Sequence, residues 1–239
     1  VASTGSAVNK PRMWSHHSVL FFDLDGALID SKSGIEMGLN ATFDIYDLPH
    51  VTTDELSWIV GPPFQVTVPQ LLGARDAHHL DVAEFIREYR KIYADGIIQE
   101  TPLMPGIAAM LQAAKEDWPL AIVTSKPEPQ ARIVLETTGV IDHFDVIVGA
   151  PMDENVRKAV LLAKACELFD ASHSLRPKHS NSWMIGDRHH DIDAATEEGV
   201  SSIGVMWGYG SHDEFTAAGA THIVHKPDEL LHLLQTQLR

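Results

Sequence analysis

The sequence has a single cysteine, Cys166, among its 239 residues. One cysteine cannot form an intrachain disulfide, so the fold needs no oxidising compartment. Cys166 lies in an apolar-periodic stretch typical of a helix, which predicts a buried structural thiol rather than a nucleophile. No apolar run reaches the roughly 18 residues of a membrane span, and residues 1–18 lack the apolar core of a secretion signal. We therefore expect a cytoplasmic protein with no membrane partner and a flexible N-terminal tail over residues 1–18.

Positive charge is also scarce. Eighteen Lys and Arg residues face 33 Asp and Glu residues, which gives a formal net charge of -15. This balance disfavours a nucleic acid as partner. If the substrate is an anion, the chain has to create positive potential locally, with a metal ion, a few lysines or helix N-termini.

Short apolar runs alternate with longer stretches of helical spacing from Val19 onward, a pattern typical of a parallel sheet covered by helices. The predicted strands are residues 19–24, 120–124, 146–149, 183–185, 202–205 and, more weakly, 223–224. The helices between them are expected to begin near Pro105, Glu128, Asn155, Asp191, Asp213 and Pro227. The predicted fold class is α/β, with a doubly wound parallel sheet.

One interval interrupts this alternation. About ninety residues between the first strand and Leu120 show helical patterns and no convincing buried strand. The expected helices are residues 33–46, 53–58, 64–72 and 81–98, and Ser33 with Glu36 fits a capping box at the first of them. We predict a helical cap domain over residues 32–102, inserted into an α/β core formed by residues 19–31 and 103–239.

Two acids follow the first apolar strand directly. Asp23 ends the strand, and Asp25 comes two residues later in a turn with Gly26. Open α/β sheets bind ligands at the carboxyl ends of their strands, and an ionised group beside a buried strand is costly unless it is paired or binds a metal. Asp23 is a candidate nucleophile, and Asp25 a candidate acid and base for the leaving group and the water. Gly26 would allow the backbone to approach a phosphate closely.

This motif allows two other interpretations. A calcium loop starting at Asp23 would need Gly at its sixth position and Glu at its twelfth, where the chain has Leu28 and Gly34. That pattern excludes the calcium loop. A purely structural turn with solvated acids stays open on this motif alone.

The run from Asp23 to Ser31 resembles the first motif of the haloacid dehalogenase-like hydrolase superfamily, and the resemblance extends over the chain from Val19 onward. Three later motifs of that superfamily follow in the required order. They are Thr124-Ser125-Lys126 after the second strand, Lys158 at the start of a later helix, and Gly186-Asp187-Arg188 with Asp191 after the fourth strand. The resemblance implies a Rossmann-like core and a phosphatase that forms an aspartyl-phosphate.

The residue types of these motifs suit that chemistry. The Thr124 hydroxyl can donate to a phosphoryl oxygen, and Ser125 and Lys126 are candidates for phosphate binding, although Thr124 or Ser125 could instead be a helix N-cap. A lysine can neutralise charge that develops on the phosphoryl group. Arg157 is an alternative to Lys158, but helix geometry points the two side chains about 100° apart, and the resemblance selects Lys158.

A third carboxylate, Asp187, is expected at the same sheet edge. Asp23, Asp25 and Asp187 would together form an oxygen-rich metal site, and Mg²⁺ is the implied cofactor. Asp191 and Arg188 are expected to support this site from behind, with Asp191 holding Lys158 or a metal-bound water.

The neighbouring His189 and His190 raise the question of a transition metal. The sequence offers them no His-x-x-x-His spacing and no cysteine partner, and hard oxygen ligands dominate this region, which argues against zinc.

The cap and its loop bear on the substrate. Gly61-Pro62-Pro63 resembles a cap loop of phosphoglycolate phosphatase-like and 5'-nucleotidase-like members, so Gly61 and Pro62 are candidate substrate-binding residues. The basic residue that often follows this loop is replaced by Phe64-Gln65, which would weaken binding of a second anion, whereas Phe64 could stack on a base.

The expected substrate is a small phosphorylated metabolite, either phosphoglycolate or a nucleoside monophosphate, and the chain is expected to be a monomer or homodimer. A phosphomutase and a non-enzymatic receiver-like switch are less favoured, because the last acidic motif differs from that of mutases and a receiver needs neither a cap nor Asp25.

Overall fold

The computed structural model describes residues 18–152, 156–173 and 182–237. The expected tail over residues 1–18 therefore lies almost entirely outside the described residues. Six parallel strands form one sheet in the order β3-β2-β1-β4-β5-β6. They are β1 (Leu20–Phe22), β2 (Leu120–Pro127), β3 (Val146–Ala150), β4 (Trp183–Gly186), β5 (Ser201–Val205) and β6 (His222–Val224). The predicted doubly wound α/β fold is confirmed.

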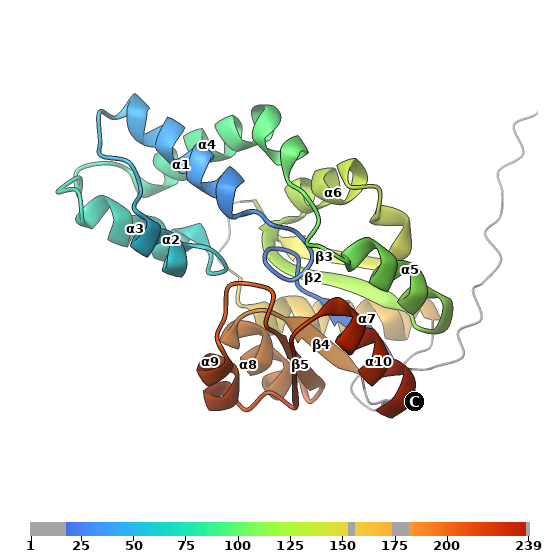
Figure 1. The fold of residues 1–239 in the computed structure, drawn as a ribbon. Coiled ribbons are helices and arrows are strands. Elements are labelled where there is room, and N and C mark those ends of the chain that lie inside the picture. The colour runs from blue at the N-terminus through green and yellow to red at the C-terminus, as the bar shows by residue number, and fades with distance from the viewer. Residues whose placement is uncertain (1–17, 153–155, 174–181, 238–239) are drawn as a thin grey trace, which may run out of the picture.

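Helices cover both faces of this sheet (Figure 1). They are α5 (Ile107–Asp117), α6 (Glu128–Thr137), α7 (Lys158–His173), α8 (His189–Glu198), α9 (His212–Ala218) and α10 (Pro227–Gln237), with a short helix η3 (Ile141–His143) before β3. Phe22 packs with α5, α6 and α10 in one core cluster, whereas the next residue back, Phe21, packs with α7 and α8 in another. This alternation explains why the strands are apolar without interruption. Cys166 is buried in the second cluster, as predicted.

The interval between β1 and β2 is helical, as the sequence predicts. It contains α1 (Lys32–Ile45), α2 (Thr53–Ile59), α3 (Phe64–Gly73), α4 (Val82–Ile92) and the short helices η1 (Tyr93–Ile97) and η2 (Ile98–Glu100). These elements, called the cap helices below, form a group beside the sheet in Figure 1. The last predicted helix, residues 81–98, ends earlier than expected because Asp95 and Gly96 leave the helical conformation, Gly96 with φ of 105°. The exact limits of the cap domain, residues 32–102, stay a prediction.

The capping box expected at Ser33 is wrong. Helix α1 begins at Lys32 and its N-cap is Ser31, whose side chain makes no capping hydrogen bond. The backbone N–H groups of Ser31 and Lys32 donate instead to the hydroxyl of Tyr209, at 3.0 and 3.1 Å. Tyr209, which is distant in the sequence, thus accepts the hydrogen bonds that a local capping side chain would otherwise accept. No helix among the described residues is both long and apolar enough to cross a membrane.

Candidate active site

Three neighbouring strands bring the predicted polar residues to one edge of the sheet. Strand β1 lies between β2 and β4, so Asp23 after β1, Thr124 in β2 and Asp187 after β4 meet where these parallel strands end. Asp23 is fixed there by its backbone N–H, which donates to the carbonyl of Ile185 at 2.9 Å. The register of the sheet therefore positions the site.

Asp23 is paired with a lysine. Only 5% of Asp23 is exposed, and the Nζ atom of Lys158 lies 2.5 Å from its Oδ1 atom and 2.9 Å from Oδ1 of Asp191. Lys158 is the first residue of α7, so its long side chain reaches from the helix start to the strand ends. Arg157, the alternative weighed from the sequence, is largely exposed and pairs with Glu197 at 2.7 Å. The two side chains point to different surroundings.

Burial and charge set the ionisation of this group. Burial raises the pKa of Asp23 to about 7, although the nearby Lys158 ammonium opposes the rise. Burial alone would lower the pKa of Lys158, but the carboxylates of Asp191 and Asp23 outweigh burial and raise it. Lys158 is therefore charged at neutral pH and supplies the local positive potential that the acidic chain requires.

Asp187 follows β4 and is fully buried. Its Oδ2 atom accepts a hydrogen bond from the backbone N–H of Tyr209 at 2.8 Å, whereas its Oδ1 atom has no hydrogen-bond partner among the described residues. Gly26 makes room for it: its φ is +85°, and a Cβ atom there would overlap the Asp187 carboxylate. Only a residue without a side chain can therefore stand at position 26 beside Asp187.

The acidic group fits a hard cation. Carboxylate oxygens of Asp23, Asp187 and Asp191 lie within 4.8 Å of one another. Burial, followed by the charges of Asp23 and Asp191, raises the pKa of Asp187 well above its usual range. A divalent cation would satisfy the unpartnered Oδ1 atom and remove this repulsion, and oxygen-only ligands suit Mg²⁺. Asp191 pairs with Lys158 and accepts a hydrogen bond from the backbone N–H of Arg188 at 3.1 Å. It thereby helps to position the lysine that contacts Asp23.

Asp25 faces a second lysine. Lys126 Nζ lies 2.8 and 3.1 Å from the two carboxylate oxygens of Asp25, and also lies 5.2 Å from the centre of the Tyr93 ring. The group of carboxylates whose oxygens lie within 4.8 Å of one another contains Asp23, Asp187 and Asp191 but not Asp25. Its predicted role as a metal ligand stays a prediction, as does phosphate binding by Lys126.

Thr124 and Ser125 both line the cleft beside Asp23. The alternative that either caps a helix is not what the structure shows, because the N-cap of α6 is Pro127. Thr124 is 1% exposed, and its hydroxyl oxygen accepts a hydrogen bond from the backbone N–H of Lys126 at 3.1 Å. Its hydroxyl proton can still be donated to a phosphoryl oxygen.

A cleft of about 750 Å³, measured to its open mouth, separates these residues from the cap helices. Gly61 and Pro62 line it, next to Phe64, Tyr89 and Tyr93. The three aromatic rings form a continuous wall: the Phe64 and Tyr89 ring centres are 4.6 Å apart, and those of Tyr89 and Tyr93 are 5.5 Å apart.

The cap also contributes a cation. The sequence indicated that a cap cation is lost where Phe64-Gln65 replaces the usual basic residue, but Arg90 on α4 lines the same cleft. Sequence reasoning missed Arg90 because it lies 26 positions beyond Phe64 and has no local motif. Only the packing of α4 brings it to the cleft.

Arg188 connects the core to the cap loop. Its Nε atom donates to Glu214 at 3.0 Å, and its Nη1 atom donates to the carbonyl oxygen of Val60 at 2.8 Å. The next cap residue, Gly61, has φ of +110°, a conformation that side chains rarely adopt. Arg188 therefore holds the loop that lines the cleft.

Two further residues that sequence reasoning did not assign support the first motif. Trp207 donates from its indole N–H to the carbonyl of Ala27 at 2.8 Å. Tyr209 contacts both Asp187 and the start of α1, and its hydroxyl donates to Asp30 at 3.1 Å. The only signal in the sequence is the Trp207-Gly208-Tyr209-Gly210 turn itself. The turn holds the loop that carries Asp23 and Asp25.

A doubly wound sheet with buried acids and a lysine at its carboxyl edge defines an α/β enzyme with a site suited to phosphoryl groups. The family model described as haloacid dehalogenase-like hydrolase matches residues 20–205. The chain belongs to that family, as the motifs predict.

Curated relatives include proteins with different named activities. Tyrosine-protein kinase PtkA of Mycobacterium tuberculosis is 33% identical over 87% of this chain and 68% of its own. The solved structure of that kinase has a TM-score of 0.74 at 32% identity, covering 91% of this chain and 97% of the other. A 5'-nucleotidase of Pseudomonas aeruginosa is 31% identical (85% and 89% covered), and a phosphoglycolate phosphatase of Yersinia pseudotuberculosis is 30% identical (79% and 80% covered).

Proposed function

We propose that the chain is a Mg²⁺-dependent phosphatase that hydrolyses a small phosphate monoester through an aspartyl-phosphate on Asp23. The observation that carries this proposal is the position of Asp23, which lines the cleft, pairs with the charged Lys158 and belongs to the same acidic group as Asp187. A structural turn with solvated acids would not bury Asp23 and Asp187 together. The phosphatases among the relatives support the same chemistry.

Asp23 and Asp187 are the residues that would hold Mg²⁺, with Asp191 behind them. The ion would supply positive charge to the phosphoryl oxygens and to the clustered carboxylates. Asp23 has to be ionised to attack phosphorus, and Lys158 favours this ionised form against the effect of burial.

In the first half-reaction an oxygen of Asp23 forms a bond to phosphorus while the bond from phosphorus to the leaving oxygen breaks. Asp25 donates a proton to that oxygen, which leaves as an alcohol. Because Asp25 contacts Lys126 in the present structure, it has to exchange this contact for the leaving group and carry a proton when it does so. Lys158 and the Thr124 hydroxyl are placed to stabilise the transferring phosphoryl group.

In the second half-reaction the ionised Asp25 accepts a proton from water. The water oxygen bonds to phosphorus, and the bond between phosphorus and Asp23 breaks. Phosphate leaves, Asp23 is an ionised carboxylate again, and Asp25 carries the proton needed for the next turnover. The sum is one ester and one water consumed, and one alcohol and one phosphate formed.

Two substrate classes are favoured by different residues of the cap. Arg90 favours a leaving group with a second anion, as in phosphoglycolate, because it places a cation on the cap side of the cleft. The aromatic wall of Phe64, Tyr89 and Tyr93 favours a nucleoside monophosphate, whose base could stack on a ring. Arg90 and the three rings line the same cleft, so both classes are candidates.

The decisive experiment measures phosphate release with Mg²⁺ from phosphoglycolate, nucleoside monophosphates and an aryl phosphate. Asp23→Asn should lower kcat by roughly 10⁴-fold or more, because the nucleophile is lost. Acid-quenched wild-type protein should carry one phosphoryl group on the peptide that contains Asp23, and the variant none. Full turnover by Asp23→Asn would overturn the mechanism. Loss of substrate without release of phosphate would indicate transfer to another acceptor, as the name of the mycobacterial kinase suggests.

A further inference from the structure

A second group of possible metal ligands lies at the start of α8. His189 and His190 are the first two residues of this helix, and Asp193 follows three and four residues later. Residues three or four apart lie on the same face of a helix, so the Asp193 carboxylate is on the side of both imidazoles. From the sequence, the missing His-x-x-x-His spacing, the missing cysteine partner and the dominance of hard oxygen ligands argued against a transition metal here. The fold supplies a carboxylate instead.

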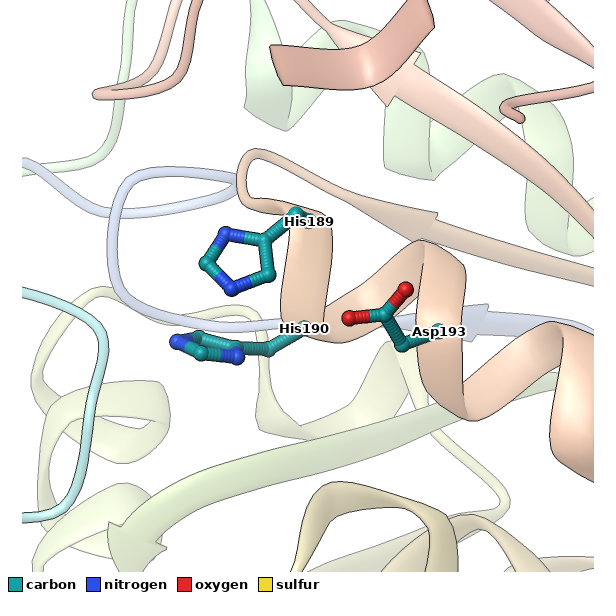
Figure 2. A group of neighbouring side chains, drawn as sticks. All are labelled: His189, His190 and Asp193. Atoms are coloured by element: carbon teal, nitrogen blue, oxygen red, sulfur yellow. The ribbon is translucent and has the colours of Figure 1, made fainter. Parts of the chain in front are cut away.

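The geometry of this group suits a single ion. One donor atom from each of His189, His190 and Asp193 lies within 4.8 Å of the others, and the ring centres of the histidines are 3.8 Å apart. Figure 2 shows both rings on the same side of the helix start, with the Asp193 carboxylate turned toward them. Ligand bonds of roughly 2.0–2.2 Å at tetrahedral angles put donor atoms about 3.3–3.6 Å apart, well inside this limit. Binding would require the His190 and Asp193 side chains, which are at least partly exposed, to rotate to that spacing.

The orientation of His189 is already fixed. Its Nδ1 atom lies 2.8 Å from Oε1 of Glu214, which also accepts a hydrogen bond from the backbone N–H of His189 at 2.8 Å. This contact leaves Nε2 for a metal, and a carboxylate on the far nitrogen is the usual partner of a metal-binding histidine. In the parts of the chain that the structure describes, neither His190 nor Asp193 makes a side-chain hydrogen bond or ion pair. Their donor atoms are therefore available.

This group is separate from the acidic group of the active site. The two groups share no residue, and Asp191, between His190 and Asp193 in the sequence, pairs with Lys158. Imidazole nitrogens favour Zn²⁺, Ni²⁺, Cu²⁺ or Co²⁺ over Mg²⁺. The positive end of the α8 dipole opposes a cation, but Asp193, Glu214 and the net charge of -15 offset it. We propose that His189, His190 and Asp193 form a transition-metal site, with open coordination positions for water, that is distinct from the proposed Mg²⁺ site.

The test is a titration of the full chain with Zn²⁺, and in parallel with Co²⁺ to follow its visible absorption, in saturating Mg²⁺ and without phosphate. Wild-type protein should bind one equivalent at this site. The double variant His189→Gln/His190→Gln should lose that equivalent, and Asp193→Asn should weaken it at least tenfold. The matched control is His78→Gln/His79→Gln, which removes another pair of adjacent, exposed histidines and should leave binding unchanged.

Two further measurements keep the outcomes distinct. Asp187→Asn should retain the equivalent, because it alters only the acidic group. Thermal unfolding should show that Asp193→Asn, an exposed substitution, is folded. The proposal fails if Mg²⁺-saturated wild-type protein binds no Zn²⁺, if the His189/His190 double variant binds it with unchanged affinity, or if Asp187→Asn abolishes binding. None of these results depends on phosphatase activity, so they leave the proposed function untouched.

Discussion

Across the cleft, the wall at the ends of β1 and β2 carries acids that pair with lysines, whereas the wall built by the cap helices carries aromatic rings. The core wall has Asp23 with Lys158 and Asp25 with Lys126, each pair at 2.5–2.8 Å. The cap wall has Phe64, Tyr89 and Tyr93, joined by ring contacts. Under the proposed function, the charged groups would act on the phosphoryl group that all phosphate esters share, and the rings would contact the part that differs between esters. This proposed division assigns catalysis to the core and substrate selection to the cap.

The largest test of this division is Asp25→Asn. The loss of an acid and base should lower kcat by roughly 10²–10⁴-fold. The division requires the same factor for phosphoglycolate and for a nucleoside monophosphate, measured by phosphate release under saturating Mg²⁺. Asp44→Asn, on an exposed cap position, is the control. A loss confined to one substrate would mean that Asp25 also takes part in selection.

Phe64→Ala tests the cap wall. A base that stacks on this ring would lose about 1–3 kcal/mol, so KM for nucleoside monophosphates should rise roughly tenfold or more, and KM for phosphoglycolate should stay within about twofold. Arg90→Gln is the counterpart and should penalise phosphoglycolate more. Ile45→Ala, an exposed apolar position on the cap, is the control. Equal effects of Phe64→Ala on both substrates would remove the reason for considering nucleotides.

Arg188→Lys tests the connection between the two walls. The planar guanidinium of Arg188 donates to Val60 and Glu214 at the same time. A lysine ammonium lacks this geometry, so the cap loop should be held less firmly. One weakened hydrogen bond costs about 0.5–1.5 kcal/mol, and KM should rise about 2–10-fold for all substrates with little change in kcat. Initial-rate kinetics with two substrates measure this. A drop in kcat with unchanged KM would instead place Arg188 in the chemistry.

Asp187→Asn tests how much the buried charge of Asp187 destabilises the metal-free protein. The raised pKa of Asp187 means that its ionised form destabilises the metal-free fold, and this cost disappears as the pH falls below the raised pKa toward the ordinary value of 3.8. The variant should therefore stabilise the metal-free protein at pH 8 by about 1 kcal/mol, roughly 2–4 °C in Tm. The gain should shrink toward pH 5. Calorimetry of wild-type and variant protein in a chelator, at pH 8 and pH 5, measures both the gain in Tm and its decrease. A variant Tm below that of the wild type at pH 8 would contradict the prediction.

The core wall could largely be anticipated from the sequence, whereas the cap wall could not. Asp23, Thr124 and Asp187 each follow an apolar run, and parallel strands bring their carboxyl ends to one edge. The cap has no such rule. Arg90 and Phe64 are far apart in the sequence, and their approach to one cleft depends on how α3 and α4 pack.

The same limit applies to pairs of residues. The motif spacing placed Lys158 near the sheet edge, but its distance from Asp23 depends on the rotation of α7 about its axis. Nothing local indicated that Lys126 would pair with Asp25, or that Tyr209 would cap α1 in place of Ser33. These contacts join residues more than 100 positions apart, so sequence periodicity carries no information about them.

By itself, the sequence determined the parallel α/β sheet, the helical insertion and the edge at which the acids gather, because apolar periodicity fixes which segments are buried strands and where they end. Tertiary structure alone decided which acid faces which lysine and which rings face the cleft. Side-chain proximity depends on strand order, helix rotation and cap packing, and these are properties of the whole folded chain.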